Sequence, residues 1–272
     1  MLQSLLNAFE TTLKDLSALL LLPALMGLLI HLVETASYNI QSRTFGRWFT
    51  IISTGWLGVP VHEFGHMFFC VPFMHRIDEV QLFSVSGSQK TLGFVKHSYN
   101  PKNPVAVLGN LFIGFGPLLL GSAIIWLCFK LVVPDLLHLL LQDASFTDAM
   151  FWTVSLPGIA SGIDLSSGWT WLCLYVVFCT ASHMGPSVSD IKSGLSGAAA
   201  LFLLVFALNL AAMAPRLGSL KNAGLLLYHA GRIISMLMLP ATTAAIAGFL
   251  LSWLAATVFS LLTEKEIPMP WR

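Results

Sequence analysis

The stretch GVPVHEFGHMFF, residues 58–69, places His62, Glu63 and His66 inside an otherwise apolar run. On insertion scales, one ionisable side chain near the centre of a bilayer costs on the order of 2.5–3.5 kcal/mol. Three of them within five residues are therefore expected to serve a chemical function. The alternative is a polar cluster that forms hydrogen bonds between helices, which is the better interpretation for a single intramembrane histidine.

The rest of the chain has the composition of an integral membrane protein. Its 272 residues are 56% hydrophobic and 10% charged, against roughly 25% charged residues in an ordinary soluble domain. The net charge of +1 provides no basic field, so no nucleic-acid partner is expected. The four cysteines lie in apolar stretches without a C-x-x-C spacing and are predicted to be buried free thiols.

Apolar runs predict the number of membrane-spanning helices. Crossing the hydrocarbon core takes about 20 predominantly apolar residues in a helix. Six segments approach that length: Leu16–Val33, Phe49–Met74, Val105–Val133, Trp169–Met184, Leu195–Ala214 and Ile234–Leu262. We therefore expect an all-α polytopic membrane protein in a lipid bilayer, with its first segment retained as a span rather than cleaved as a signal.

The six segments are expected to form a single transmembrane domain over residues 1–272. Its core is predicted at residues 49–194, flanked by helices at 16–33, 195–214 and 234–262. Helix breakers lie within the second segment, at Gly55, Gly58 and Pro60, and directly after the fourth, at Gly185-Pro186. Such breaks at membrane depth are tolerated only where protein or a watery cavity satisfies the freed backbone groups, so both segments are predicted to lie in the interior.

A small membrane-associated β-hairpin is predicted after the second segment. Val80–Val85 and Thr91–Lys96 are short runs of β-prone residues, and Ser86–Lys90 between them has the composition of a turn. A loop in solvent is the alternative interpretation.

Charge asymmetry between two loops predicts the orientation of the chain. Residues 134–168 contain four Asp and no Lys or Arg, whereas residues 75–104 contain one Arg and three Lys. Under the positive-inside rule, the second of these loops faces the cytoplasm, and both termini then lie on the same side. Arg43 and Arg47 fall on the opposite side in this arrangement, which weakens the signal.

The five residues His62–His66 have the pattern H-E-x-x-H. Helical residues four positions apart share one face, so both imidazoles can reach one metal ion at roughly 2.0–2.1 Å. Glu63 is then placed to take a proton from a zinc-bound water, whose pKa zinc lowers to about 7. The pattern therefore predicts a hydrolytic zinc site with Glu63 as its base.

Two histidines do not complete such a site, because catalytic zinc usually has three protein ligands and an open position. The candidates for the third ligand are His75, Asp164, His183 and Asp190. Asp190 and His183 lie in or just after the irregular fourth segment, and the choice between them stays open here.

Together, these residues resemble the site-2 protease family of intramembrane zinc metalloproteases. His62, Glu63 and His66 match its first motif, and Pro186 and Asp190 are similar to its second, a Pro-containing stretch with a later Asp. Residues 109–117, GNLFIGFGP, look like the Gly-Pro helix that the family places between the two motifs. The resemblance departs from the family at residue 191, where Ile stands in place of the usual Gly.

The resemblance implies one zinc ion held by His62, His66 and Asp190, with Glu63 as the catalytic residue. The implied substrate is the transmembrane segment of a membrane protein, held in an extended form by the hairpin. Asn110 and His183 are candidates for binding the substrate or stabilising its oxyanion, with an interhelical hydrogen bond as the alternative role for Asn110. The implied location is the cytoplasmic (inner) membrane of a bacterium.

Two other classes of protein are compatible with the sequence. A metal transporter or sensor would use the two histidines to bind an ion, and a non-catalytic relative of the family would bind membrane clients without cleaving them. Transport is expected to place ionisable groups along a path, yet residues 195–214 and 234–262 contain none. The metalloprotease is therefore the preferred hypothesis.

Overall fold

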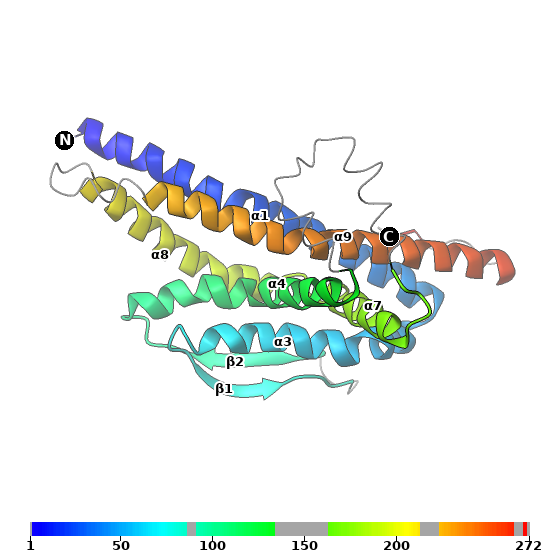
Figure 1. The fold of residues 1–272 in the computed structure, drawn as a ribbon. Coiled ribbons are helices and arrows are strands. Elements are labelled where there is room, and N and C mark those ends of the chain that lie inside the picture. Colours follow the sequence, from blue (N-terminus) through cyan, green and yellow to red (C-terminus); the bar gives the residue numbers. More distant parts are fainter. Residues whose placement is uncertain (1, 86–90, 134–162, 213–222, 264–268, 271–272) are drawn as a thin grey trace, which may run out of the picture.

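The computed structural model of the chain describes residues 2–85, 91–133, 163–212, 223–263 and 269–270. These residues form a helical bundle with one two-stranded antiparallel sheet against its side (Figure 1). In chain order the elements are α1 (Leu2–Thr44), α2 (Arg47–Thr50), the π-helical turn η1 (Ile51–Gly55), α3 (Trp56–Cys70), β1 (Arg76–Gln81), β2 (Phe94–Ser98), α4 (Pro104–Val132), α7 (Gly168–Ala181), α8 (Val188–Ala212) and α9 (Ala223–Thr263).

Four of these helices are long and apolar enough to cross a membrane, namely α1, α4, α8 and α9. The protein is thus an integral membrane protein, and its described residues contain fewer full-length spans than the six predicted. The second predicted segment is one continuous run of helical backbone from α2 through the π-helical turn η1 to α3, and α3 alone has 15 residues. The fourth corresponds to α7, whose 14 residues end at Ala181.

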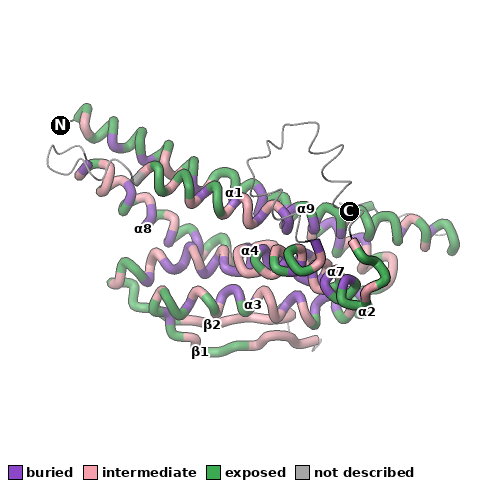
Figure 2. The backbone as a smooth tube through the Cα atoms, viewed as in Figure 1, coloured by how far each residue is buried: buried purple, intermediate pink, exposed green. Residues whose placement is uncertain are grey.

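Helix α4 is the centre of the bundle. It contacts α3, α7, α8 and α9, while α1 and α9 pack along each other on one side (Figure 1). In the most apolar window of α4, 56% of the residues are buried, against 22–28% in the other three long helices. The outer helices have exposed residues along much of their length (Figure 2). Many of these residues are large and apolar, as expected for surfaces that face lipid.

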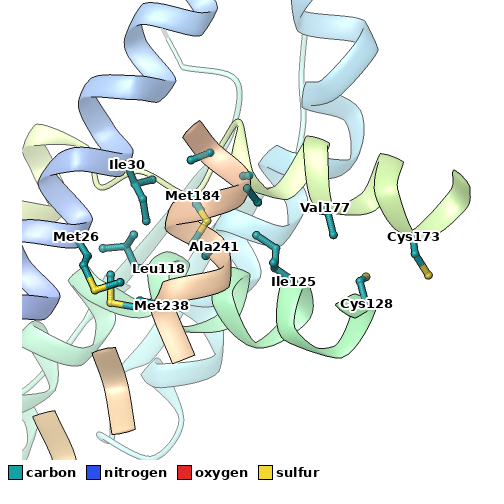
Figure 3. Packing of buried hydrophobic residues seen from close by; sticks show 13 residues of the cluster. Met26, Ile30, Leu118, Ile125, Cys128, Cys173, Val177, Met184, Met238 and Ala241 are labelled. Atoms are coloured by element: carbon teal, nitrogen blue, oxygen red, sulfur yellow. The ribbon is translucent and has the colours of Figure 1, made fainter. Parts of the chain in front are cut away.

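The main apolar core lies where α1, α4, α7 and α9 meet (Figure 3). Ile30 of α1, Leu118 of α4 and Met238 of α9 are each fully buried there. Met184 belongs to the same core with 1% of its surface exposed, although it lies in the turn between α7 and α8. This turn is therefore anchored in the core by a side chain. The four cysteines are buried and free, as predicted.

The helix that carries the H-E-x-x-H pattern packs very closely on α4. A Cβ atom at Gly65 would lie 2.6 Å from the Cα of Pro117. A Cβ atom at Gly116 would likewise meet the backbone oxygen of Gly65. Because neither residue has a side chain, the two backbones lie in direct contact, and this contact brings His66 close to the backbone of α4.

The predicted hairpin is present, with its strands shifted along the chain. β1 and β2 pair in antiparallel fashion from Arg76↔Ser98 to Gln81↔Phe94, with an irregularity between Ile77 and Glu79. The backbone N–H of Ser84 donates to the carbonyl of Leu92, so the two arms stay together beyond the paired strands. The predicted turn Ser86–Lys90 lies outside the described residues, as does most of the acidic segment 134–168.

Candidate metal centre

The rings of His62 and His66 are fixed by backbone carbonyl groups. His62 Nδ1 lies 2.7 Å from the carbonyl oxygen of His183, and His66 Nδ1 lies 2.8 Å from that of Ile113. A carbonyl oxygen only accepts hydrogen bonds, so both Nδ1 atoms carry the proton and donate it. In the neutral imidazoles the two Nε2 atoms are therefore bare, which is the state that a metal ligand requires.

The carbonyl of Ile113 is available because of the sequence of α4. Its usual partner in an α-helix is the N–H of the residue four positions later, which here is Pro117 and has no N–H. The carbonyl of His183 is available because it lies in the turn after α7 has ended. Both carbonyl groups thus come from places where regular helical bonding is interrupted.

The two bare nitrogen atoms and a carboxylate converge on one point. The Nε2 atoms of His62 and His66 are 3.2 Å apart, and the Oδ atoms of Asp190 lie 3.4 Å from His66 Nε2 and 3.8 Å from His62 Nε2. Ligands at 2.0–2.1 Å from a tetrahedral zinc ion are separated by about 3.3–3.4 Å. Lone pairs at these distances repel unless a cation lies between them, so the donor set fits a zinc ion.

A helix cap fixes the carboxylate of Asp190. The backbone N–H of Ser187 donates to Asp190 Oδ2 over 2.7 Å, and the backbone N–H of Asp190 donates to Ser187 Oγ over 3.2 Å. This reciprocal pair is a capping box at the start of α8. It explains why α8 begins at Val188, before the predicted Leu195, and it holds Asp190 beside the histidines.

Glu63 lies next to the two histidines without joining their donor set. Its side chain is buried, with 6% of its surface exposed. A Cβ atom at Gly93 would stand 2.8 Å from Glu63 Oε1, so the segment just before β2 lies directly over the carboxylate. Because this position has no side chain, the hairpin can approach the base closely.

A cavity of about 300 Å³ opens beside these groups. Its walls come from α3, from the arm of the hairpin around β2, from α4 and from the start of α8. The lining residues are His62, Glu63, His66, Thr91, Gly93, Phe94, Val95, His97, Ile113, Ser187, Ser189, Asp190 and Ser193. The donor set and Glu63 therefore share one cavity with a peptide strand.

His97 on β2 is a further imidazole in this cavity, and the sequence analysis did not identify it. His75 Nε2 lies 2.8 Å from the carbonyl oxygen of Ala106, so it donates, and the Nδ1 atom of neutral His75 accepts. His97 Nδ1, at 2.9 Å, is then the donor to His75 Nδ1. Burial, reinforced by the neighbouring His75, lowers the pKa of His97 from its usual value of 6.5.

The other candidates from the sequence lie elsewhere. Asn110 Nδ2 donates to Ser196 Oγ over 2.9 Å and thus links α4 to α8, and His183 Nε2 lies 2.9 Å from Thr54 Oγ1. Neither is among the described residues that line the cavity. Asp164 accepts hydrogen bonds from Ser166 at the start of α7, and His75 supports the hairpin. The residue that the structure brings to the histidines is Asp190.

Comparison of the chain with protein-family models, with curated proteins and with solved structures gives no match. The site is therefore interpreted from its own geometry.

Proposed function

We propose that this protein is an intramembrane zinc metalloprotease of the site-2 protease kind, which hydrolyses a peptide bond of a membrane protein. The observation that carries the proposal is the pair of bare Nε2 atoms, 3.2 Å apart, with Asp190 beside them and the carboxylate of Glu63 in the same cavity. Two nitrogen ligands, one oxygen ligand and a separate carboxylate are what zinc peptidases require.

In this proposal each residue has a distinct role. His62, His66 and Asp190 would hold the ion. When bound, zinc supplies a Lewis acid that makes water acidic and polarises a carbonyl group. Glu63 takes the proton from the attacking water and delivers it to the nitrogen of the departing amine. Its burial beneath the hairpin keeps bulk water away from this proton transfer.

The substrate in this proposal is an extended segment of a transmembrane helix. A helix hides its carbonyl groups in backbone hydrogen bonds, so the scissile region has to unwind before it is attacked. The cavity wall that includes Gly93, Phe94 and Val95 belongs to the hairpin, whose backbone can pair with an unwound strand. The hairpin would thereby replace the hydrogen bonds that the substrate loses.

The proposal includes a location in the cytoplasmic (inner) membrane of a bacterium, with the N-terminus in the cytoplasm. It is supported by the four candidate spans and by the basic residues of the segment 75–104. The carbonyl groups of Met269 and Pro270 accept hydrogen bonds from Arg43 and Asn39, near the end of α1 that lies opposite Leu2. The C-terminus is therefore expected on the other side of the membrane, and not on the side of the N-terminus as the sequence predicted. The cavity beside β2 would then receive water from the cytoplasmic side. Fusion of a reporter to each terminus, read out on both sides of the membrane, tests this orientation.

The metalloprotease is tested by separating metal binding from catalysis. The purified full chain is expected to contain one zinc ion and to cleave a transmembrane reporter substrate. Glu63→Gln is expected to retain the zinc and lose cleavage, because the amide cannot accept the proton. Glu10→Gln is the matched control, since Glu10 is exposed and pairs only with Lys14 along α1.

Each other outcome has a defined meaning. If the parent protein binds no zinc, the metal centre is wrong. If it binds zinc and Glu63→Gln still cleaves, Glu63 is not the base. Zinc binding with no cleavage by the parent, together with retention of a membrane client, would favour the non-catalytic relative, and zinc flux into vesicles would favour the transporter.

A further inference from the structure

Glu34 of α1 is an ionisable residue that directly follows the apolar run Leu16–Val33. Ionisable groups within a membrane helix are costly, and their partners indicate their role. Glu34 Oε2 accepts a hydrogen bond of 2.8 Å from the backbone N–H of Gly185. The two residues are 151 positions apart in the chain. This contact joins α1, which contributes no side chain to the cavity, to the turn between α7 and α8.

The turn formed by residues 182–187 orients two of the proposed ligands, His62 and Asp190, with one backbone group for each. The carbonyl of His183 accepts the hydrogen bond from His62 Nδ1, and the N–H of Ser187 donates to Asp190 Oδ2. Gly185 lies between these two groups in the chain. A displacement of the turn would therefore move one ring and one carboxylate of the donor set together.

Three contacts hold the turn in place. Met184 anchors it in the apolar core (Figure 3), and the ring of His183 bonds to Thr54 of η1. The third contact is Glu34, which bonds to the backbone of the turn at Gly185. A Cβ atom at Gly185 would collide with Glu34 Oε2, so the turn and the carboxyl group lie in direct contact.

We infer that Glu34 is a positioning residue of the metal centre, holding the turn 182–187 so that His62 and Asp190 converge. This inference rests on the proposed zinc site. The contact requires an oxygen acceptor at the end of the side chain, and it does not require a negative charge. Residues that orient metal ligands typically change metal affinity by about 10–100-fold when they are replaced.

The experiment measures the zinc dissociation constant of purified full-length variants by competition with a chelator, without any assay of cleavage. Glu34→Ala is expected to raise this constant by about 10–100-fold. Glu34→Gln keeps an oxygen acceptor and is expected to stay close to the parent. Thr35→Ala is the matched control, because Thr35 is exposed and its hydroxyl bonds to the carbonyl of His31 in its own helix.

Two further measurements separate positioning from a general loss of structure. The melting temperature of each metal-free variant reports on folding, and the visible spectrum of the cobalt-loaded protein reports on ligand geometry. We expect the Glu34→Ala spectrum to change and the Glu34→Gln spectrum to match the parent. If Glu34→Ala does not yield folded protein, Gly185→Ala tests the same contact from the side of the turn and is also expected to weaken zinc binding.

The inference is overturned if Glu34→Ala, or Gly185→Ala in its place, binds zinc as tightly as the parent. It is also overturned if Glu34→Gln is as weak as Glu34→Ala, since the carboxyl group itself would then be needed. A parent protein that binds no zinc would instead refute the proposed metal centre. Failure of this inference and failure of the proposed function are thus distinct results.

Discussion

Gly93, one residue before β2, lies against the carboxylate of Glu63 on α3, and a Cβ atom at Gly93 would stand 2.8 Å from both Glu63 Oε1 and Val59 Cγ1. Both neighbours are held by the packing of α3, and Glu63 is buried. An added methyl group therefore has to displace either the base or the hairpin. The distance between the hairpin and the base is thus set by the absence of one side chain.

Gly93→Ala is expected to reduce cleavage by about 10–100-fold, because displacements of the order of 1 Å at a reacting centre have effects of that size. Zinc stoichiometry is expected to stay at the value of the parent, since the atoms nearest to a Cβ atom at Gly93 belong to Glu63 and Val59 and not to the donor set. Gly168→Ala is the control, because a Cβ atom there meets nothing within 4 Å. Full activity of Gly93→Ala would show that the hairpin does not hold the substrate beside Glu63.

The third ligand is tested by a pair of variants. Asp190→Asn keeps an oxygen that can accept the hydrogen bond from Ser187, so the start of α8 is preserved while the charged ligand is lost. We expect its zinc affinity to fall by more than about 100-fold. Replacing a residue that only orients a metal ligand usually lowers the affinity by less than this. His183→Ala is expected to retain zinc, because His62 uses the backbone carbonyl of residue 183 and not its ring. The opposite pattern would make His183 the ligand.

The apolar runs of the sequence predicted six helical segments, and each corresponds to a helix of the described residues. Hydropathy could not reveal that one of them is irregular and another is short. The second segment contains the π-helical turn η1, which has no distinct composition. The fourth stops at Ala181, before an apolar Met184 that enters the core from a turn. Burial in the core and contact with lipid both favour apolar residues. A membrane-spanning helix and a turn that enters the core therefore look alike in the sequence.

The sequence predicted the metal-binding side chains that lie close together along the chain. It did not predict the backbone carbonyl groups that orient these side chains. The spacing of His62, Glu63 and His66 identified the helix face, and Asp190 was among the proposed ligands. The orienting carbonyl of Ile113 was not predicted, because it depends on the packing of α3 against α4. One signal was available, since Pro117 leaves the carbonyl four residues before it without its helical partner.

Pro117→Ala is expected to change metal binding and helix stability in opposite directions. Alanine restores an N–H that can bond to the carbonyl of Ile113 and compete with His66 Nδ1, so zinc affinity is expected to fall by about 10-fold or more. The metal-free protein is expected to melt at the same or a higher temperature, because an internal proline disfavours a helix. Pro240→Ala in α9 is the control, since its helix lies outside the cavity. Unchanged zinc affinity in Pro117→Ala would mean that Ile113 does not orient His66.

The pairing of His97 with His75 predicts a pH dependence of stability. Burial, reinforced by the neighbouring His75, lowers the pKa of His97 below its usual 6.5, so the folded protein favours the neutral ring. Above about pH 6.5 the ring is neutral in both states, and its contribution to stability is fully present. As the pH falls below that value, the unfolded chain binds a proton that the folded chain resists, so the free energy of unfolding decreases until the pH reaches the lowered pKa.

The measurement compares the melting temperatures of the parent and of His97→Gln at pH 7.5 and pH 5.5, with zinc removed from both. The parent is expected to lose more stability than the variant over this interval, since glutamine has no proton to bind. Because His75 loses its hydrogen-bond partner in the variant, the comparison reports on the His75–His97 pair as a unit. Equal losses would show that the folded protein does not hold the ring of His97 neutral.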